Sequence, residues 1–241
     1  MRESLIRAEA VLGSEALAVL GKKHVAVFGL GGVGAACAEA LARCGIGKLS
    51  LIDGDIVQES NLNRQLIALH STIGQKKTEA AAARLRDINP EIELMLYQIV
   101  FDKDSVHDVD IASCDYIVDA IDTVTSKLLL ARMAQTNHIR IISCMGMGNK
   151  VDPAKLRFAD IHATSVCPLC RAMRQCTKKA GIVRLEVLYS TETPVSRNTF
   201  TTAGGRHAPG SVSFLPPIAG MMIAGRIILQ LSGFSADSSA I

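Results

Sequence analysis

HVAVFGLGGVG, residues 24–34, runs from an apolar segment into a glycine-rich loop. His24 to Phe28 predicts a buried strand, and a helical pattern follows over residues 32–44. The loop between them carries Gly29, Gly31, Gly32 and Gly34. Gly29, Gly31 and Gly34 satisfy a GxGxxG pattern in the strand–turn–helix setting that the pattern requires. A helix that begins in such a loop binds phosphate at its N-terminus. The stretch therefore predicts a nucleotide-binding domain without saying which nucleotide.

Strand and helix signals continue to alternate on the C-terminal side of this loop. Strands are expected over residues 48–53, 116–120 and 140–143, and helices over 76–88 and 126–137. Such alternation is typical of a parallel sheet with crossover helices. The predicted fold class is α/β, a Rossmann-like mostly parallel sheet with flanking helices.

Beyond about residue 150 the alternation weakens, and prolines and a glycine-rich run over 201–210 interrupt it. We expect a helical segment over 1–20, the Rossmann-like nucleotide domain over 21–150, and a smaller α+β substrate lobe with a C-terminal helix over 151–241. The most apolar stretch, 211–233, contains two adjacent prolines and Arg226, so a buried or interface helix is favoured over a membrane span.

The composition of the 241-residue chain limits its class. Hydrophobic residues make up 49% and charged residues 20%, which excludes a disordered protein. The net charge of +3 neither requires nor excludes a polyanionic partner. Seven cysteines without a secretory signal indicate a reducing compartment, and a cytoplasmic location is expected.

Asp53 closes the second expected strand, where a carboxylate can accept hydrogen bonds from ribose hydroxyls. On the loop and Asp53 alone, a nicotinamide-dependent dehydrogenase would be favoured. Asn61, Arg64 and Lys77 follow shortly afterwards, and a hydride-transfer site has no use for two cations there. An enzyme that attacks the α-phosphate of ATP does need them, because fixed cationic donors stabilise the charge that builds on the phosphoryl oxygens.

A second carboxylate motif, Asp119-Ala120-Ile121-Asp122, follows the expected strand over 116–120. It should lie at the carboxyl edge of the sheet, beside the phosphates, where Asp122 could hold Mg²⁺ together with phosphate oxygens. Two simpler interpretations remain open. Asp122 could cap the helix near Ser126, and Arg64 and Lys77 could be solvated surface charges.

Four segments, GLGGVG (29–34), DGDIVQESNLNRQ (53–65), IGQKK (73–77) and DAIDT (119–123), resemble the ATP site of an adenylating superfamily. This superfamily includes ubiquitin-activating enzymes and the adenylyltransferases of sulfur carriers. The resemblance implies contacts to ATP or its Mg²⁺ from Gly32, Asp53, Asn61, Arg64, Lys77 and Asp122. It also implies a homodimer in which Arg7, in RAEAVLG, reaches the ATP of the other subunit as an arginine finger.

Within this superfamily, residues 149–174, YSTETPV (189–195) and GSVSFLPPIAGMMIAG (210–225) resemble the tRNA threonylcarbamoyladenosine dehydratase family. That resemblance covers nearly the whole chain. It implies that ATP adenylates the threonyl carboxylate of threonylcarbamoyladenosine at position 37 of tRNA, after which the side chain cyclises and AMP leaves. The net change is loss of water, and no protein nucleophile is needed.

The cysteines help to choose between branches. Sulfur-carrier adenylyltransferases carry two CxxC pairs that bind zinc, whereas this chain has only Cys167-Pro168-Leu169-Cys170. A structural zinc is therefore not expected, although Cys176 and His162 could complete an irregular site. Members of the dehydratase family commonly have Asp-Pro-Leu where this chain has Cys-Pro-Leu, so any role of that aspartate is in doubt here.

A helix expected over 168–180 carries basic residues at three- and four-residue spacing, which could follow the phosphate backbone of tRNA: Arg171, Arg174, Lys178 and Lys179. A solvated helix face is the competing interpretation. Two other functions stay open, an adenylyltransferase for a ubiquitin-like sulfur carrier and an NAD-binding oxidoreductase. A sulfur-transfer partner of the cysteine desulfurase type is also possible.

Overall fold

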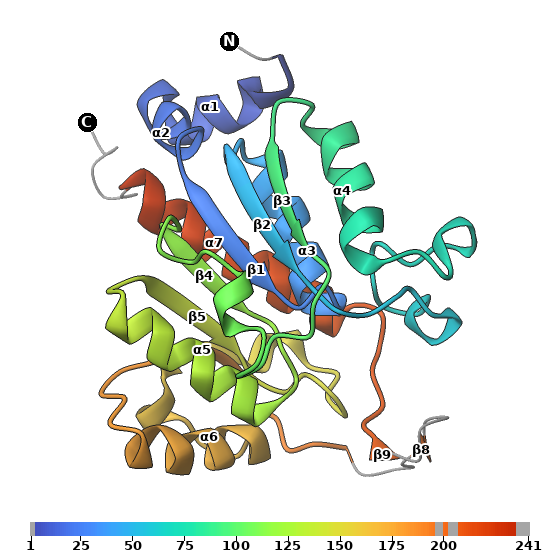
Figure 1. The fold of residues 1–241 in the computed structure, drawn as a ribbon, viewed down its shortest axis with the longest axis vertical. Helices are drawn as coiled ribbons and strands as arrows, with labels where there is room; N and C mark the ends of the chain where they lie inside the picture. Colours follow the sequence, from blue (N-terminus) through green and yellow to red (C-terminus); the bar gives the residue numbers. More distant parts are fainter. Residues whose placement is uncertain (1–2, 196–199, 202–206, 235–241) are drawn as a thin grey trace.

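The computed structural model describes residues 3–195, 200–201 and 207–234. Seven strands form one sheet with the order β3-β2-β1-β4-β5-β7-β6 (Figure 1). All neighbours pair in parallel except β6, which runs antiparallel to β7 at one edge. The strands are β1 His24–Phe28, β2 Lys48–Ile52, β3 Glu93–Tyr97, β4 Tyr116–Asp119, β5 Arg140–Cys144, β6 Leu156–Asp160 and β7 Glu186–Ser190. The predicted α/β class with a mostly parallel sheet is confirmed.

The burial of their residues explains why some strands could be predicted from the sequence and others could not. All five residues of β1 and all four of β4 are buried, as expected for central parallel strands covered on both faces. β1 and β4 pair directly, with Val27 opposite Val118. The edge strand β3 has only exposed and half-buried residues and was not predicted.

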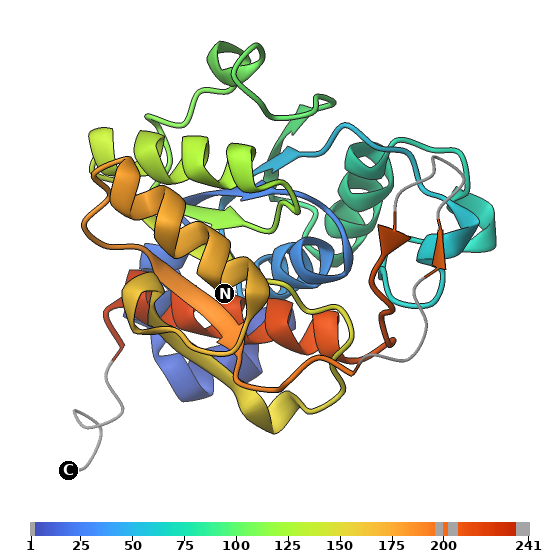
Figure 2. The ribbon, with the colours of Figure 1, turned by 90° about the horizontal axis from the view of Figure 1, so that it is seen from below.

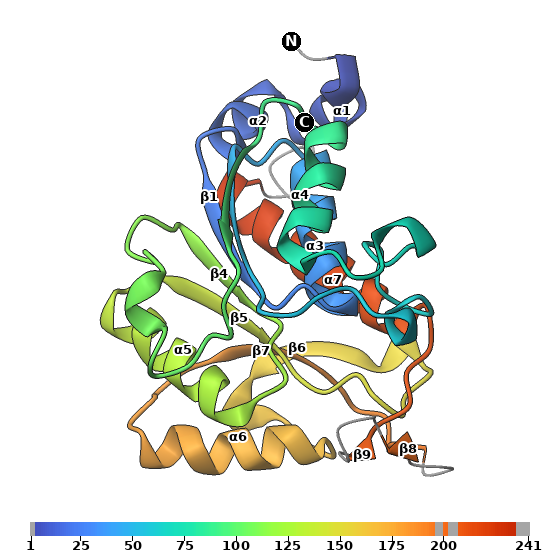
Figure 3. The same ribbon diagram turned by 45° about the vertical axis from the view of Figure 1, so that its right-hand side comes forward.

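Helices cover both faces of the sheet (Figure 3). On one face lie α3 Gly32–Arg43, α4 Lys77–Ile88 and α7 Leu215–Ser232. On the other lie α5 Val124–Thr136 and α6 Pro168–Lys179, which run side by side (Figure 2). The short helices α1 Ile6–Leu12 and α2 Ser14–Leu20 form the N-terminal segment.

The C-terminal helix α7 packs along α3. A Cβ on Gly220 would lie 2.3 Å from the carbonyl oxygen of Val33, so only glycine permits this approach. Ile223 and Ile227 are fully buried on the same face. α7 is long and apolar enough to cross a membrane by length and composition alone, and 44% of it is buried inside the protein.

The region expected to form a separate lobe continues the main sheet. β6 and β7 pair with each other and β7 pairs with β5, so the sheet runs through the boundary expected at residue 150. Only the hairpin of β8 Phe200–Thr201 and β9 His207–Ala208 forms a second sheet among the described residues. Half of the glycine-rich run expected over 201–210, residues 202–206, lies outside the described residues.

Candidate nucleotide-binding site

The candidate site lies where the carboxyl ends of β1, β2 and β4 meet. The strand order reverses between β1 and β4, and open parallel sheets bind ligands at such a switch point. The glycine-rich loop leaves β1 here and enters α3, whose first turn has no side-chain cap. Its first N–H groups therefore face the carboxyl edge without a helical acceptor, which suits an anion.

Two glycines of the loop are required by close packing. Gly29 has φ +88°, and a Cβ there would lie 2.6 Å from the carbonyl oxygen of Ala120. A Cβ on Gly34 would lie 1.8 Å from the carbonyl oxygen of Gly29. The loop is thus pressed against the turn that follows β4, and only glycine allows this arrangement.

Gly31 has a different surrounding. A Cβ there would meet only the Nε2 of Gln65, at 3.9 Å, so nothing else in the described chain covers this position. Gly32 lies under Pro216 and beside Arg64, with the Arg64 carbonyl oxygen 3.2 Å from its ideal Cβ. The loop is therefore packed by protein on one side and open at Gly31, which leaves a cradle of the kind that takes a phosphate.

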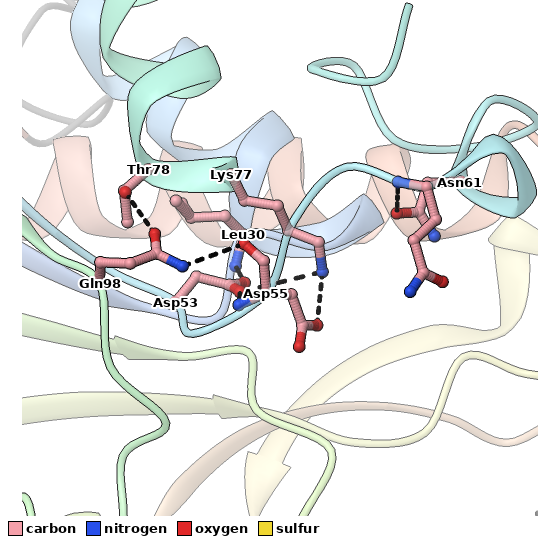
Figure 4. Close-up of polar contacts among 8 residues, drawn as sticks. Leu30, Asp53, Asp55, Asn61, Lys77, Thr78 and Gln98 are labelled. Atoms are coloured by element: carbon pink, nitrogen blue, oxygen red, sulfur yellow. Dashed lines mark hydrogen bonds and ion pairs between the residues drawn. The ribbon is translucent and has the colours of Figure 1, made fainter. Parts of the chain in front are cut away.

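Asp53 orders this loop. One of its carboxylate oxygens accepts from the backbone N–H of Leu30 at 2.6 Å and the other from that of Asp55 at 2.8 Å (Figure 4). Burial raises the pKa of Asp53, an effect that the nearby Lys77 ammonium and these two N–H groups oppose. The Asp53 carboxylate, which was expected to bind ribose, therefore also accepts a hydrogen bond from the phosphate loop. Its remaining lone pairs can still accept from a ligand.

Lys77 is buried rather than solvated. It is 6% exposed, and its Nζ lies 2.7 Å from Asp55 and 3.9 Å from Asp53 (Figure 4). The interpretation of Lys77 as a surface charge is therefore wrong. Asp55 is 68% exposed, so the ammonium can exchange this solvated partner for an anion without leaving the site.

Arg64 and Asn61 lie on the segment that passes the loop. Arg64 is half-buried as a residue, and its guanidinium donates exposed hydrogen bonds to the carbonyl oxygen of Ser60 at 2.9 Å and to Asn63 Oδ1 at 2.8 Å. Asn61 is buried, and its Oδ1 accepts from the backbone N–H of Gln58 at 3.1 Å. Asn61 lies away from the group formed by Lys77, Asp53 and Asp55 (Figure 4).

Gln65 was not among the expected ligands. It is 7% exposed, and its Oε1 is the only buried side-chain N or O atom without a partner among the described residues. An unpaired buried acceptor is costly, and a bound ligand would relieve it. The signal was available in the sequence, because Gln65 follows Arg64 directly in the quoted motif.

Asp122 lies at the carboxyl edge, as expected, and is exposed. α5 begins at Val124 with Thr123 as its N-cap, and that cap makes no side-chain hydrogen bond. The interpretation of Asp122 as the cap of this helix is therefore wrong. Asp122 belongs to the turn that presses against Gly29 through Ala120, and its exposed side chain is accessible to solvent.

Behind this turn lies a buried ion pair that the sequence did not reveal. Lys127 and Asp119 are both fully buried, with Nζ 3.1 Å from Oδ1. Lys127 also donates to the Cys144 carbonyl oxygen at 2.8 Å, and the Ser143 hydroxyl donates to Asp119. Asp119 accepts in addition from the backbone N–H of Ile121 at 3.2 Å, which holds the turn that carries Asp122.

Arg7 is exposed on α1 and is not brought to the site of its own chain. α1 packs near the C-terminal end of α3, since a Cβ on Gly45 would lie 3.0 Å from the Leu5 side chain. The phosphate loop is at the other end of α3 (Figure 1). Within one subunit, Arg7 therefore has no role at this site.

The basic residues of α6 are not equivalent. Arg171, Lys178 and Lys179 are exposed, whereas Arg174 is half-buried and donates to the carbonyl oxygen of Thr164 at 2.9 Å and to its hydroxyl. Arg174 thus anchors the helix start. Of the four basic residues predicted to contact tRNA, three are exposed to solvent.

The seven cysteines are all free thiols. No group of three or more His, Cys, Asp or Glu side chains that could hold a metal occurs in the part of the chain that the structure describes. His162 Nε2 lies 3.4 Å from the carbonyl oxygen of Ile182. The irregular zinc site considered for Cys176 and His162 thus finds no support in the described residues.

Comparison with known proteins matches residues 4–240 to the model of the ThiF family. A tRNA threonylcarbamoyladenosine dehydratase of Bacillus subtilis is 36% identical over 242 residues, which cover 96% of this chain and 95% of that protein. The crystal structure of the Escherichia coli tRNA N6-threonylcarbamoyladenosine dehydratase in complex with ATP has a TM-score of 0.88 at 30% identity, covering 96% of this chain and 95% of that one. The same enzyme in complex with AMP gives a TM-score of 0.86 at 30% identity, covering 94% and 93%.

The buried ion pair makes a direct prediction. Lys127→Met should lower the free energy of unfolding by about 3–5 kcal/mol, because it leaves Asp119 charged and unpaired in the interior. Urea denaturation measures this loss. Lys76→Met, which removes a half-exposed lysine at the start of α4, should cost no more than about 1 kcal/mol.

A second substitution separates the loss of stability caused by the unpaired charge from the loss caused by altered packing. Asp119→Asn added to Lys127→Met should recover part of the stability, because the unpaired charge is gone. A Lys127→Met chain as stable as the Lys76→Met chain would show that the pair contributes nothing.

Proposed function

The chain belongs to the ThiF family, and from this membership we propose that it is an ATP-dependent tRNA threonylcarbamoyladenosine dehydratase. The observation that carries the proposal is the match in sequence and fold, over nearly the whole chain, to dehydratases whose structures hold ATP and AMP. The site agrees with it. An open glycine cradle, an unpaired buried Gln65 oxygen and two cations lie at one edge of the sheet.

The chain's own groups can perform the adenylation. The cradle at Gly31 and the N-terminus of α3 bind phosphate oxygens and orient the α-phosphate. Lys77 and Arg64 neutralise the charge that develops as the threonyl carboxylate attacks and pyrophosphate leaves. The acyl-adenylate then cyclises within the threonylcarbamoyl group and releases AMP, for which positioning suffices. The reaction removes one water in total.

Mg²⁺ fits the exposed carboxylate of Asp122. Magnesium is commonly held by one or two carboxylates together with substrate phosphates. Asp122 is exposed and follows Ala120 and Ile121, whose backbone touches Gly29 of the phosphate loop, so this carboxylate lies on the turn next to the place where phosphates would bind. The ion would neutralise phosphate charge there.

Incubation of the protein with Mg·ATP and tRNA that carries threonylcarbamoyladenosine should remove one water from the modified nucleoside and release AMP. Lys77→Ala should slow this by roughly 100- to 1000-fold, the cost of losing one charge-stabilising donor. Lys76→Ala, at the neighbouring half-exposed position, should keep the rate. Mass spectrometry of the digested nucleosides measures both.

Three outcomes distinguish the alternatives. No mass change in a protein that binds ATP would favour an adenylyltransferase of a sulfur carrier. A nicotinamide difference spectrum without ATP binding would favour an oxidoreductase. Equal rates for Lys77→Ala and wild type would remove Lys77 from the phosphate clamp.

In a homodimer, Arg7 could act at the nucleotide site of the partner subunit. Apolar side chains are exposed on three helices, of which α1 packs against α2 and α2 packs against α7 (Figure 1). They are Ile6, Val11, Val19, Met221 and Leu229. Neighbouring exposed apolar residues favour a protein interface. A two-fold dimer through these helices could carry Arg7 to the partner's phosphate loop.

Mixing inactive subunits tests this arrangement. Arg7→Ala and Lys77→Ala chains, each inactive alone, should recover about a quarter of the wild-type rate after subunit exchange, because half the dimers are mixed and each has one intact site. Mixing Arg64→Ala with Lys77→Ala should recover nothing, since both residues serve the same chain's site. An Arg7→Ala chain as active as wild type would place Arg7 outside the site. Recovery in neither mixture, once subunit exchange is confirmed, would exclude its action on the partner's site.

The exposed basic residues of α6 are proposed to bind tRNA. The start of α6 lies at the carboxyl edge of the sheet, because Leu169 packs on Gly146 just beyond β5. Lys178 and Lys179 lie at the other end of the helix. A duplex or stem could therefore follow α6 away from the site.

Reversal of Arg171, Lys178 and Lys179 to Glu should weaken tRNA binding and flatten its dependence on salt, because fewer counterions are released. Filter binding at several salt concentrations measures the slope. A matched control reverses three exposed residues elsewhere, Lys22, Arg86 and Lys103, with the same change in net charge. Equal losses in the two variants would mean that only net charge matters.

A cytoplasmic location and a cysteine desulfurase as sulfur-transfer partner stay predictions. The location agrees with the seven free thiols, because thiols stay reduced in the cytoplasm.

A further inference from the structure

Cys167-Pro168-Leu169-Cys170 has no part in the proposed reaction. Cys167 is the N-cap of α6 and Cys170 lies in its first turn, with Pro168 at the first helical position. Cys167 is 2% and Cys170 0% exposed. Two thiols separated by two residues at a helix start are the arrangement used in dithiol redox sites.

The backbone before Cys167 is strained. Val166 has φ +61°, a left-handed conformation that β-branched residues rarely adopt. The N–H of Cys167 donates to the Ser165 carbonyl oxygen at 2.6 Å, which closes a three-residue turn around Val166. Val166 itself is 50% exposed. Such strain persists only where the surroundings enforce it, and it concentrates at functional sites.

The two thiols have unlike surroundings. The Cys170 thiol lowers the pKa of Cys167, aided by the backbone N–H of Cys170, the Lys150 ammonium and the N–H of Leu169, against the effect of burial. Interaction with Cys167 and burial raise the pKa of Cys170. Cys167 is thus suited to attack a disulfide and Cys170 to resolve the product.

The pair is connected to the candidate site. Leu169, between the cysteines, packs on Gly146, and Lys150 is 2% exposed with its Nζ donating to the Gly146 carbonyl oxygen at 2.7 Å. Residues 146–150 leave β5 at the carboxyl edge. A change in the charge of Cys167 would therefore alter the surroundings of Lys150 and this segment.

We propose that Cys167 and Cys170 form a reversible disulfide that loosens the segment 146–150. The oxidant is a low-molecular-weight disulfide. The Cys167 thiolate attacks one of its sulfurs, the S–S bond breaks and one thiolate leaves. Cys170 then loses its proton and attacks the Cys167 sulfur, expelling the second thiol. The two cysteines lose two electrons and two protons, and the small disulfide becomes two thiols.

Access requires opening of the turn over 164–167. The bonds from Arg174 to Thr164 hold this turn closed, while the exposed, strained Val166 favours its opening. Reaction should therefore be slower than at an exposed thiol and should depend on the folded turn.

Redox titration of the native chain in graded mixtures of reduced and oxidised glutathione, followed by acid quench and alkylation, tests the proposal. The tryptic peptide 158–171 contains both cysteines and no other. It should lose both alkyl groups together over a narrow range of ratios, and a reductant should restore them. Cys176→Ser removes the half-buried third cysteine of α6 and should behave like wild type.

Cys170→Ser should trap Cys167 as a mixed disulfide with glutathione, since no resolving thiol remains. Amide exchange over 146–150 should be faster in the oxidised native chain than in the reduced one. A peptide that stays doubly alkylated at every ratio, while the guanidine-unfolded chain forms the disulfide, would overturn the proposal. Unchanged exchange after oxidation would overturn the coupling to the site.

Discussion

The buried ion pair of Asp119 and Lys127 holds the carboxyl edge of the sheet together. Two charges with no exposed surface persist in a protein interior only when they are paired and hydrogen-bonded. This pair joins β4 to the start of α5, and through Ser143 and Cys144 it joins β5 as well. Asp119 also fixes the turn after β4, and that turn presses on Gly29. The shape of the phosphate loop therefore depends on a pair that never touches the ligand.

A second constraint is the lack of space around the loop. Gly29 and Gly34 are packed against backbone, whereas Gly31 is open. The Asp53 carboxylate accepts a hydrogen bond from the loop at Leu30, so the cradle is formed before any ligand binds. Lys77 is buried next to it and already paired, which lowers the cost of placing a cation there. Preorganised donors of this kind are what stabilisation of a phosphoryl transition state requires.

The C-terminal third extends the same architecture. β6 and β7 continue the sheet, and α6 starts at its carboxyl edge, so the CxxC pair lies close to the segment after β5. Glu192, buried beyond β7, accepts from the backbone N–H groups of Val151 and Asp152 and ties this segment to the sheet. Chemistry at the dithiol and chemistry at the nucleotide site thus share one edge of one sheet.

Local patterns in the sequence were enough for the strand His24–Phe28, the glycine loop and helices such as α4 and α6, because buried periodicity and turn residues act over neighbouring positions. The motif order also led to Asp122, Arg64 and Lys77, which lie at this edge of the sheet, while their contacts to ATP and Mg²⁺ stay predictions. Strands β3 and β6 were missed because half-exposed edge strands lack a clear apolar pattern and gain their stability from a partner strand. Strand β7 was also missed, although it is mostly buried and pairs on both sides. The pairing of Asp119 with Lys127 and the separation of Arg7 from its own site were decided only in three dimensions. These contacts depend on how the packed sheet brings its segments together. They cannot be predicted from the spacing of residues in the sequence.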